Sequence, residues 1–254
     1  MSSASLLQTT DQFIGGKMFH LFKLEKGSYQ RESVMSVEET LEIFNTSEWF
    51  VKIDGGNGVL LFNEETGKYD LYKRFDRKFS SWKSQSELPE NTFPISNANG
   101  NVAEYFAGSF THVYHQQLVP RNPRKPDKVF RDIYRQIDHA QSEGRFGDRK
   151  VISVEIVGPN YCQTPKVPVI TLAIHSEQVI EKPQEEFKTI DEIYSYLENY
   201  FKENVIEGIV FKYKGVFHKI LADCFKIDGV SVSKWGKDGY KDDAPAPRTI
   251  MPVE

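Results

Sequence analysis

The chain has 254 residues, of which 39% are hydrophobic and 13% aromatic, enough for a full core in one large domain or two small ones. A net charge of −4 excludes a basic field over the whole surface, and two cysteines exclude a disulfide framework. A reducing compartment, cytoplasmic or nuclear, is therefore expected. No secretion signal or membrane-spanning stretch is found, so no membrane partner is expected. The sequence carries no signal of oligomeric state, and a monomer is the working expectation.

Runs of β-branched and aromatic residues predict the strands. In chain order they are expected over residues 18–24, 49–53, 59–62, 69–74, 151–157, 169–174, 206–213 and 216–221. The segment 63–67 ends in Thr66-Gly67 and predicts a hairpin turn between the third and fourth of these strands.

Three helices are predicted between and after the strands. Ser36-Val37-Glu38-Glu39 has the pattern of a capping box, which predicts a helix over about 37–45. A second helix is expected over about 127–140. Thr189-Ile190-Asp191-Glu192 is a further capping box, and apolar residues follow it at helical spacing.

Interleaved strands and helices with prominent hairpins favour an α+β fold with two packed, mainly antiparallel sheets and flanking helices. The glycine-rich fingerprints of P-loop and dinucleotide-binding proteins are absent from the sequence, which disfavours a doubly wound parallel sheet. Residues 1–234 are expected to form a single domain with a basic helical insert at about 121–150. Residues 235–254 are rich in Asp, Pro and Ala and are expected to be a C-terminal tail.

The insert at 121–150 concentrates positive charge in an otherwise acidic chain. Its basic residues are Arg121, Arg124, Lys125, Lys128, Arg131, Arg135, Arg145, Arg149 and Lys150. A solvated helical face and a surface for the RNA backbone both fit this pattern, and the sequence leaves the two interpretations open.

Lys52 is the most informative residue of the sequence. It ends the apolar run Trp49-Phe50-Val51 and is followed by Asp54 and Gly55. An ammonium group on a buried strand is costly unless the amine takes part in chemistry. A lysine nucleophile relies on desolvation or a nearby cation to lose its proton, and an attacked phosphate needs fixed cations around it. Cations and metal-binding carboxylates are therefore expected elsewhere in the chain.

Five segments in chain order supply such residues. They are Lys52-Ile53-Asp54-Gly55, Arg74-Phe75-Asp76-Arg77-Lys78, Val154-Glu155-Ile156-Val157-Gly158-Pro159, Glu207-Gly208-Ile209-Val210-Phe211-Lys212 and His218-Lys219-Ile220-Leu221. In this order they resemble the covalent nucleotidyltransferases, the superfamily of ATP-dependent DNA and RNA ligases and mRNA-capping guanylyltransferases. The resemblance covers about residues 49–226 and implies the nucleotidyltransferase fold, an ATP-grasp-like ligase adenylation domain.

The resemblance also implies roles. Lys52 would be the nucleophile that becomes adenylylated, and Lys219 would stabilise charge on the α-phosphate. Gly55 would let the backbone approach the nucleotide. A catalytic Mg²⁺, with Mn²⁺ as an alternative, would be held by carboxylates. The metal-binding carboxylates expected are Glu207, Glu155 and Asp54, and Glu155 would contact either the ribose or the metal.

A phosphate contact is expected from Arg77 or Arg74, between which the spacing does not decide. In related ligases a flat side chain after the Glu-x-x-Gly motif stacks on the base, and in this chain the strand ending at His175 leaves His175 or Leu172 for that role. The nucleotide-binding residues expected are Val51, Lys52, Asp54, Gly55, Arg74, Arg77, Glu155, His175, Lys212 and Lys219. Many family members carry Lys-x-Lys on the last strand. In this sequence Leu221 follows Lys219, and Lys226 is a candidate to compensate.

The stretch after Lys226 is too short for an OB-fold, so no OB domain is expected. The set is most similar to the small 5′-3′ RNA ligase family of eukaryotes and some large viruses. An ATP-dependent RNA ligase is therefore expected, with ATP as co-substrate and RNA 5′-phosphate and 3′-hydroxyl ends as partners. Two alternatives stay open, a GTP-dependent mRNA-capping guanylyltransferase and a non-catalytic module that binds RNA ends.

Overall fold

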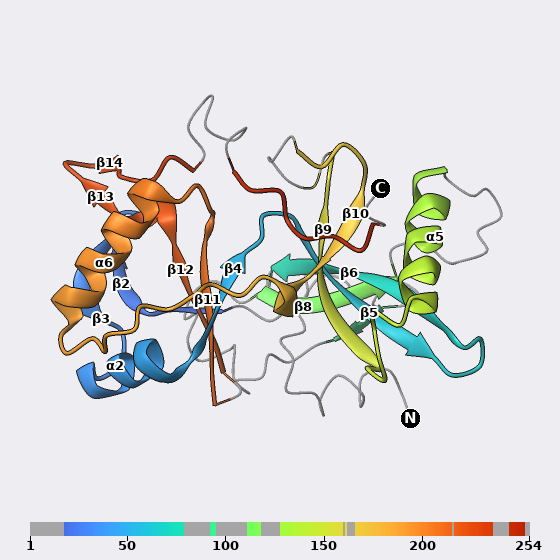
Figure 1. The fold of residues 1–254 in the computed structure, drawn as a ribbon, viewed down its shortest axis with the longest axis horizontal. Helices are drawn as coiled ribbons and strands as arrows, with labels where there is room; N and C mark the ends of the chain where they lie inside the picture. Colours follow the sequence, from blue (N-terminus) through green and yellow to red (C-terminus); the bar gives the residue numbers. More distant parts are fainter. Residues whose placement is uncertain are drawn as a thin grey trace.

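The computed structural model describes residues 18–78, 92–94, 111–117, 128–159, 161, 166–214, 216–235 and 244–251. These residues form a mixed α+β structure with mainly antiparallel sheets (Figure 1). The predicted α+β class is confirmed at this level.

Two large sheets form the frame, with strand orders β1-β12-β11-β4 and β10-β9-β5-β6-β8-β7. The first four-stranded sheet contains one parallel pairing, of β1 with β12. Two small hairpins, β2-β3 and β13-β14, complete the described strands. The strand bounds are β1 Phe19–His20, β2 Phe22–Glu25, β3 Ser28–Ser33, β4 Glu48–Lys52, β5 Gly56–Asn63, β6 Lys68–Lys78, β7 Thr92–Pro94, β8 Thr111–Gln117, β9 Val151–Val157, β10 Thr171–Ile174, β11 Gly208–Tyr213, β12 Val216–Leu221, β13 Lys226–Ile227 and β14 Val230–Ser231.

The three predicted helices are present as α2 (Val37–Thr46), α5 (Lys128–Ser142) and α6 (Ile190–Glu203). Both predicted capping boxes begin a helix. The Ser36 side chain accepts a hydrogen bond from the Glu39 backbone, and Thr189 and Glu192 cap α6 reciprocally. Two short 3₁₀ turns, η1 (His175–Glu177) and η2 (Ala222–Cys224), follow β10 and β12.

The helices cover the outer faces of the two large sheets (Figure 1). α2 and α6 lie on the first sheet, and α5 lies on the second. Alternation along β11 explains the first contact, since Ile209 and Phe211 join the helical core while Val210 and Lys212 point to the other face. Because each outer face is covered by helices, the inner faces are left to carry polar side chains.

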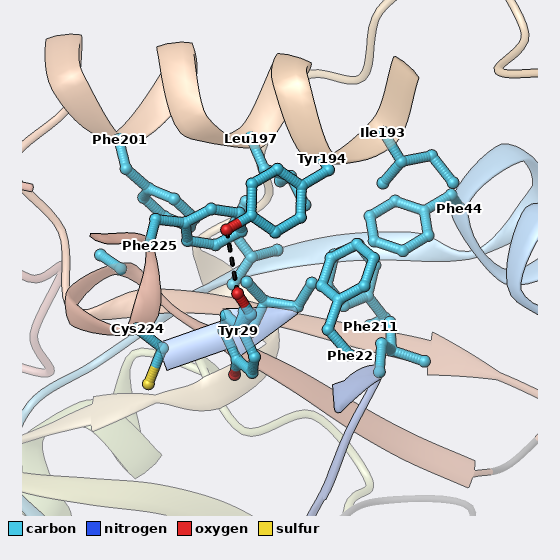
Figure 2. Close-up of a cluster of buried hydrophobic side chains, with 14 of the residues drawn as sticks. Phe22, Tyr29, Phe44, Ile193, Tyr194, Leu197, Phe201, Phe211, Cys224 and Phe225 are labelled. Atoms are coloured by element: carbon cyan, nitrogen blue, oxygen red, sulfur yellow. Dashed lines mark hydrogen bonds between the residues drawn. The ribbon is translucent and has the colours of Figure 1, made fainter. Parts of the chain in front are cut away.

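Aromatic side chains dominate the core between α6 and the first sheet. Phe22 and Tyr29 of the β2-β3 hairpin meet Phe44 of α2 and Tyr194 of α6 in this cluster (Figure 2). Phe22 and Tyr29 are packed edge to face, as are Phe22 and Tyr194, an arrangement that adds to area burial. The β2-β3 hairpin is therefore fastened to the core by its own rings.

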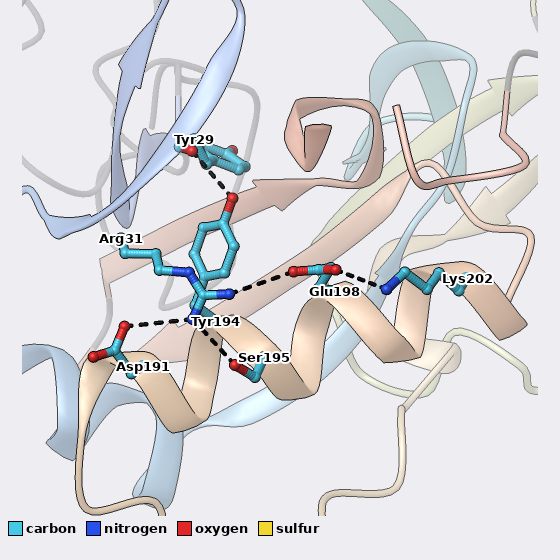
Figure 3. Close-up of polar contacts among 7 residues, drawn as sticks. All are labelled: Tyr29, Arg31, Asp191, Tyr194, Ser195, Glu198 and Lys202. Atoms are coloured by element: carbon cyan, nitrogen blue, oxygen red, sulfur yellow. Dashed lines mark hydrogen bonds and ion pairs between the residues drawn. The ribbon is translucent and has the colours of Figure 1, made fainter. Parts of the chain in front are cut away.

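Polar contacts fasten the same hairpin to the surface of α6 (Figure 3). Arg31 lies over the Tyr194 ring at 4.5 Å and donates to Asp191 and Ser195. The Tyr194 hydroxyl reaches inward and donates to the Tyr29 carbonyl at 3.1 Å. This buried bond supplies the Tyr29 carbonyl with a side-chain donor.

Part of the segment expected to be a tail lies against the second sheet. Thr249 forms a β-bridge with Ala173 of β10, and the Ile250 amide donates to the Leu172 carbonyl at 2.9 Å. Ile250 is buried in the core under α5. Thr249 and Ile250, which lie in the stretch 235–254 expected to be a C-terminal tail, are therefore packed against β10 and the core under α5.

Replacing Tyr194 with Phe tests the buried bond to Tyr29. The ring packing stays and the Tyr29 carbonyl loses its donor, so we expect the free energy of unfolding to fall by about 1–2 kcal/mol. Urea denaturation would show a lower midpoint at an unchanged m-value. Ser195→Ala, which removes only an outer contact of Arg31, is the control and should change the free energy of unfolding by less than about 0.5 kcal/mol. Equal midpoints for Tyr194→Phe and the unchanged protein would contradict this expectation.

Candidate functional site

A cavity of about 420 Å³ lies between the inner faces of the two large sheets. This volume is within the range of small-molecule sites in proteins. The lining residues come from both sheets and the segments beside them. They are Met18, Glu48, Phe50, Val51, Lys52, Ile53, Gly55, Asn57, Arg74, Ser153, Glu155, His175, Val179, Glu207, Val210, Lys212, Phe217, Lys219 and Leu221.

Strand pairing places the lysines of the first sheet on one face. Gly208 of β11 pairs with Lys52 of β4, and Val210 pairs with Lys219 of β12. Side chains paired across neighbouring strands, or two positions apart along one strand, share a face of a sheet. Lys52 and Lys219 therefore flank β11 from its two sides, with Lys212 further along the same strand.

Lys52 is held by Glu207 inside the cavity. Its Nζ atom donates to Glu207 Oε1 at 2.5 Å, with 20% and 22% of the two side chains exposed. The second oxygen, Glu207 Oε2, is buried and has no hydrogen-bond partner within the described part of the chain. Burial raises the pKa of Glu207, the Lys52 ammonium opposes this shift, and the nearby Asp54 and Glu155 charges add to it. Desolvation therefore disfavours the ionised form of the Glu207 side chain.

The second sheet contributes a connected polar group. Ser153 and Glu155 of β9 face the cavity two residues apart, and His175 follows β10. The imidazole Nδ1 lies 2.8 Å from Ser153 Oγ, and Nε2 lies 2.7 Å from Glu155 Oε2. All three side chains are largely shielded from solvent.

Two motif glycines are required by close approach of neighbouring strands. A methyl group at Gly55 would overlap the Ile156 carbonyl oxygen and lie 2.8 Å from Glu155 Cγ. A methyl group at Gly208 would overlap the Ile220 carbonyl oxygen. The sequence assigned Gly55 to a close approach of a nucleotide, and the structure provides a second reason, because β9 itself passes at this point.

Strand β1 pairs with β12, the strand that carries Lys219, at the edge of the first sheet. His20 pairs with Lys219 in the β1-β12 ladder, and His20 Nδ1 lies 2.5 Å from the Tyr29 hydroxyl. Burial, and the Lys219 ammonium, lower the pKa of His20 to about 4. His20 is therefore neutral at pH 7 and adds no charge beside Lys219.

The cavity brings together nine of the residues predicted from the sequence. They are Val51, Lys52, Gly55, Arg74, Glu155, His175, Glu207, Lys212 and Lys219. Asp54 is not among the lining residues, although its charge acts on Glu207. The backbone of Arg77 pairs with His112 in the β6-β8 ladder, and its side chain lies outside the described atoms.

Strand β12 departs from the expected pattern of lysines. Leu221 lines the cavity at the position where the resemblance led us to expect a second lysine. Lys226, the candidate to compensate, does not line the cavity, and its Nζ atom lies near Gly27 in the β2-β3 turn. Lys212 on the neighbouring strand is a further cation that the cavity does contain.

The basic residues of α5 lie on the far side of the second sheet from the cavity. Ile133 and Ile137 pack with Ile152 and Val154 of β9, whereas Ser153 on the same strand faces the cavity. Within α5 the exposed basic residues are Lys128, Arg131 and Arg135. This placement favours the solvated-face interpretation for α5. Residues 121–127 of the predicted insert lie outside the described residues.

Other lining residues were not singled out from the sequence. They include Glu48, Phe50, Asn57, Ser153, Val210 and Phe217. Most of them lie two positions along the chain from a predicted site residue, as Phe50 does from Lys52 and Ser153 from Glu155. Strand alternation, applied outward from each motif residue, would have found them.

Comparison with protein-family models and with curated proteins found no match to this chain. In the described part of the chain, no group of three or more His, Cys, Asp or Glu side chains is arranged to hold a metal ion. None of the described helices is long and apolar enough to cross a membrane.

Glu207→Gln tests the desolvation of this carboxylate. A carboxyl whose pKa is raised on folding favours the folded state below its ordinary pKa, near 4.5, and loses that contribution as the pH rises through the raised value. The amide does not titrate, so we expect the stability of the unchanged protein relative to Glu207→Gln to fall as the pH rises from below 4.5 toward 7. Thermal unfolding of both proteins across this pH range measures it, and a difference independent of pH would contradict the assignment.

Proposed function

We propose that this protein is an ATP-dependent RNA ligase with a nucleotidyltransferase fold, in which Lys52 carries AMP. One observation supports this proposal above all others. The Lys52 amine, held by Glu207, lies in a cavity that also contains Arg74, Lys212 and Lys219. An amine surrounded by further cations suits attack on a polyphosphate, whose negative charge the cations would offset.

In the first step the Lys52 amine would attack the α-phosphorus of ATP. A nitrogen–phosphorus bond forms, the bond between the α-phosphorus and the bridging oxygen breaks, and pyrophosphate leaves. Lys52 must give up a proton before the attack, and the contact with Glu207 Oε1 provides an acceptor. Because burial raises the pKa of Glu207, it holds a proton more readily than a solvated carboxylate does.

The remaining cations would stabilise charge that develops on the α-phosphate. Lys219 lies across β11 from Lys52, and Arg74 approaches from the opposite sheet. Fixed donors of this kind contribute about 10²–10³ in rate when aimed at the charge of the transition state. Cations on both walls suit a phosphate chain that spans the cavity.

A divalent cation fits the acidic side of the cavity. Glu207 Oε2 is buried without a partner in the described residues, and Glu155 and Asp54 are close enough to raise the Glu207 pKa. Mg²⁺ or Mn²⁺ is commonly held by one or two carboxylates together with phosphate oxygens. Glu207, with Glu155, would hold such an ion, which when bound supplies charge neutralisation at the phosphates.

The later steps would join RNA ends. AMP would pass from Lys52 to an RNA 5′-phosphate, and a 3′-hydroxyl would then attack that phosphate and release AMP. The lysine is restored, a phosphodiester forms, and the diphosphate linkage of the RNA adenylate breaks.

Incubation with ATP labelled at the α-phosphorus, followed by a denaturing gel, tests the first step. We expect a covalent label on the protein that Lys52→Ala abolishes, because the attacking nitrogen is gone. Lys68→Ala is the matched control, since Lys68 pairs with Asp138 on the outer surface and should leave the label intact. Labelling by GTP instead of ATP would favour a capping guanylyltransferase. No label from either nucleotide, with RNA ends still bound, would favour a non-catalytic module.

Lys219→Ala tests the proposed phosphate contact. We expect lysyl-AMP formation to slow by about 10²–10³-fold, because one fixed cation at the α-phosphate is lost. Lys226→Ala is the control at a lysine outside the cavity and should change the rate by less than about threefold, within the range of effects at surface sites. Rapid-quench measurement of the labelled protein gives both rates. Equal rates for the two variants would remove Lys219 from the site.

A further inference from the structure

His175 is linked at both ring nitrogens to side chains of β9. Nδ1 contacts Ser153 Oγ at 2.8 Å and Nε2 contacts Glu155 Oε2 at 2.7 Å. All three residues line the cavity. The sequence suggested His175 as a flat side chain for stacking on the base, a role that uses the face of the ring and requires no bond from its edge.

The β9-β10 ladder explains why these side chains meet. Ala173 of β10 pairs with Glu155, and Ile174 pairs with Val154. Continuing this register brings His175 opposite Ser153, with Glu155 at the diagonal position on the same face. The imidazole is long enough to contact both residues, so the connection follows directly from the strand pairing.

The hydrogen-bond directions can be assigned from the chemistry of the groups. An ionised carboxylate only accepts, so Nε2 carries a proton and donates it to Glu155 Oε2. In the neutral ring Nδ1 is then the acceptor, and the Ser153 hydroxyl donates to it. The Glu155 carboxylate thereby selects the tautomer, and the Ser153 hydroxyl, which can donate or accept, complements it at Nδ1.

The turn that carries His175 is itself anchored. Glu177 of η1 pairs with Arg145 at 2.9 Å, and the same guanidinium donates to the Thr249 carbonyl at 2.8 Å. Arg145, which follows α5, thus connects η1 with the C-terminal segment that pairs with β10. The backbone at His175 is therefore held by the β9-β10 pairing before it and by the Glu177–Arg145 ion pair after it.

We infer that His175 is a positioning residue, which together with Ser153 holds the Glu155 carboxylate in one orientation toward the cavity. Pinning Oε2 fixes the plane of the carboxylate and therefore the direction in which Oε1 points. Glu155 would then meet a hydroxyl group or a cation of the bound nucleotide complex without first losing rotamer freedom. This inference rests on the proposed nucleotide-binding function of the cavity.

Two substitutions of opposite character separate positioning from stacking. His175→Phe keeps a flat ring and removes the donor to Glu155. His175→Gln removes the ring and keeps a donor near the place of Nε2. Positioning predicts that His175→Phe weakens kcat/KM for lysyl-AMP formation about 10–100-fold, as for other residues that orient a ligand, and that His175→Gln recovers most of the loss. Stacking predicts the reverse order, and that order would overturn the inference.

A double-mutant cycle with Glu155 provides the second readout. If His175 acts through Glu155, His175→Phe should have little further effect on ATP binding or on lysyl-AMP formation once Glu155 is Ala. Additive losses would show that His175 acts on the nucleotide by itself. Ser153→Ala leaves the His175 ring in place and should give a smaller loss in the same direction. No change in Ser153→Ala would remove Ser153 from the inference.

Two controls keep the outcomes separate. Unfolding by urea should give similar midpoints for His175→Phe and His175→Gln, so that their difference in rate reflects the site. The unchanged protein must form the labelled adduct with ATP in the same assay. Absence of that adduct would contradict the proposed function. Its presence with the stacking order of variants would contradict only the positioning role of His175.

Discussion

The ion pair of Lys52 and Glu207 is the interaction on which the arrangement of the two sheets and their helices depends. Each of these groups is costly to remove from water alone, and each makes the other tolerable in a partly buried cavity. Such a pair is best accommodated on the face of a sheet that does not pack against a hydrophobic core. The chain meets this condition by placing α2 and α6 behind the first sheet and α5 behind the second. Because the hydrophobic side chains pack on the outer faces of the sheets, charged side chains can occupy the inner faces.

Close strand contacts then bring the charges within reach of one another. Gly55 and Gly208 each stand where a methyl group would overlap a carbonyl oxygen of a neighbouring strand. Gly55 follows the strand that carries Lys52 and touches the strand that carries Glu155. Gly208 follows Glu207 and touches the strand that carries Lys219. A larger residue at either position would separate two of the motifs, so the glycines are as much a part of the site as the charged residues.

Local patterns were sufficient to predict much of this architecture. The capping boxes at Ser36 and Thr189 located two helices, and the ordered motifs identified most of the charged lining of the cavity. Contacts set by tertiary pairing were not predictable in this way. Residues 244–251 have the composition of a tail, and they pair with β10 because that edge is open to them. The bonds of His175 depend on the register between β9 and β10, which the sequence of either strand alone does not specify.

Burial in the cavity destabilises the charged form of Glu207, and a bound cation would offset this cost. Burial, together with the Asp54 and Glu155 charges, raises the pKa of Glu207, and the Glu207 Oε2 atom is buried without a partner among the described residues. Lys212, Lys219 and Arg74 line the same cavity, so basic as well as acidic side chains face it. A phosphate chain would neutralise the cations, and a divalent ion would neutralise the carboxylates. Ligands that bind only the folded state stabilise it, so a phosphate chain and a divalent ion bound as we propose would raise the free energy of unfolding.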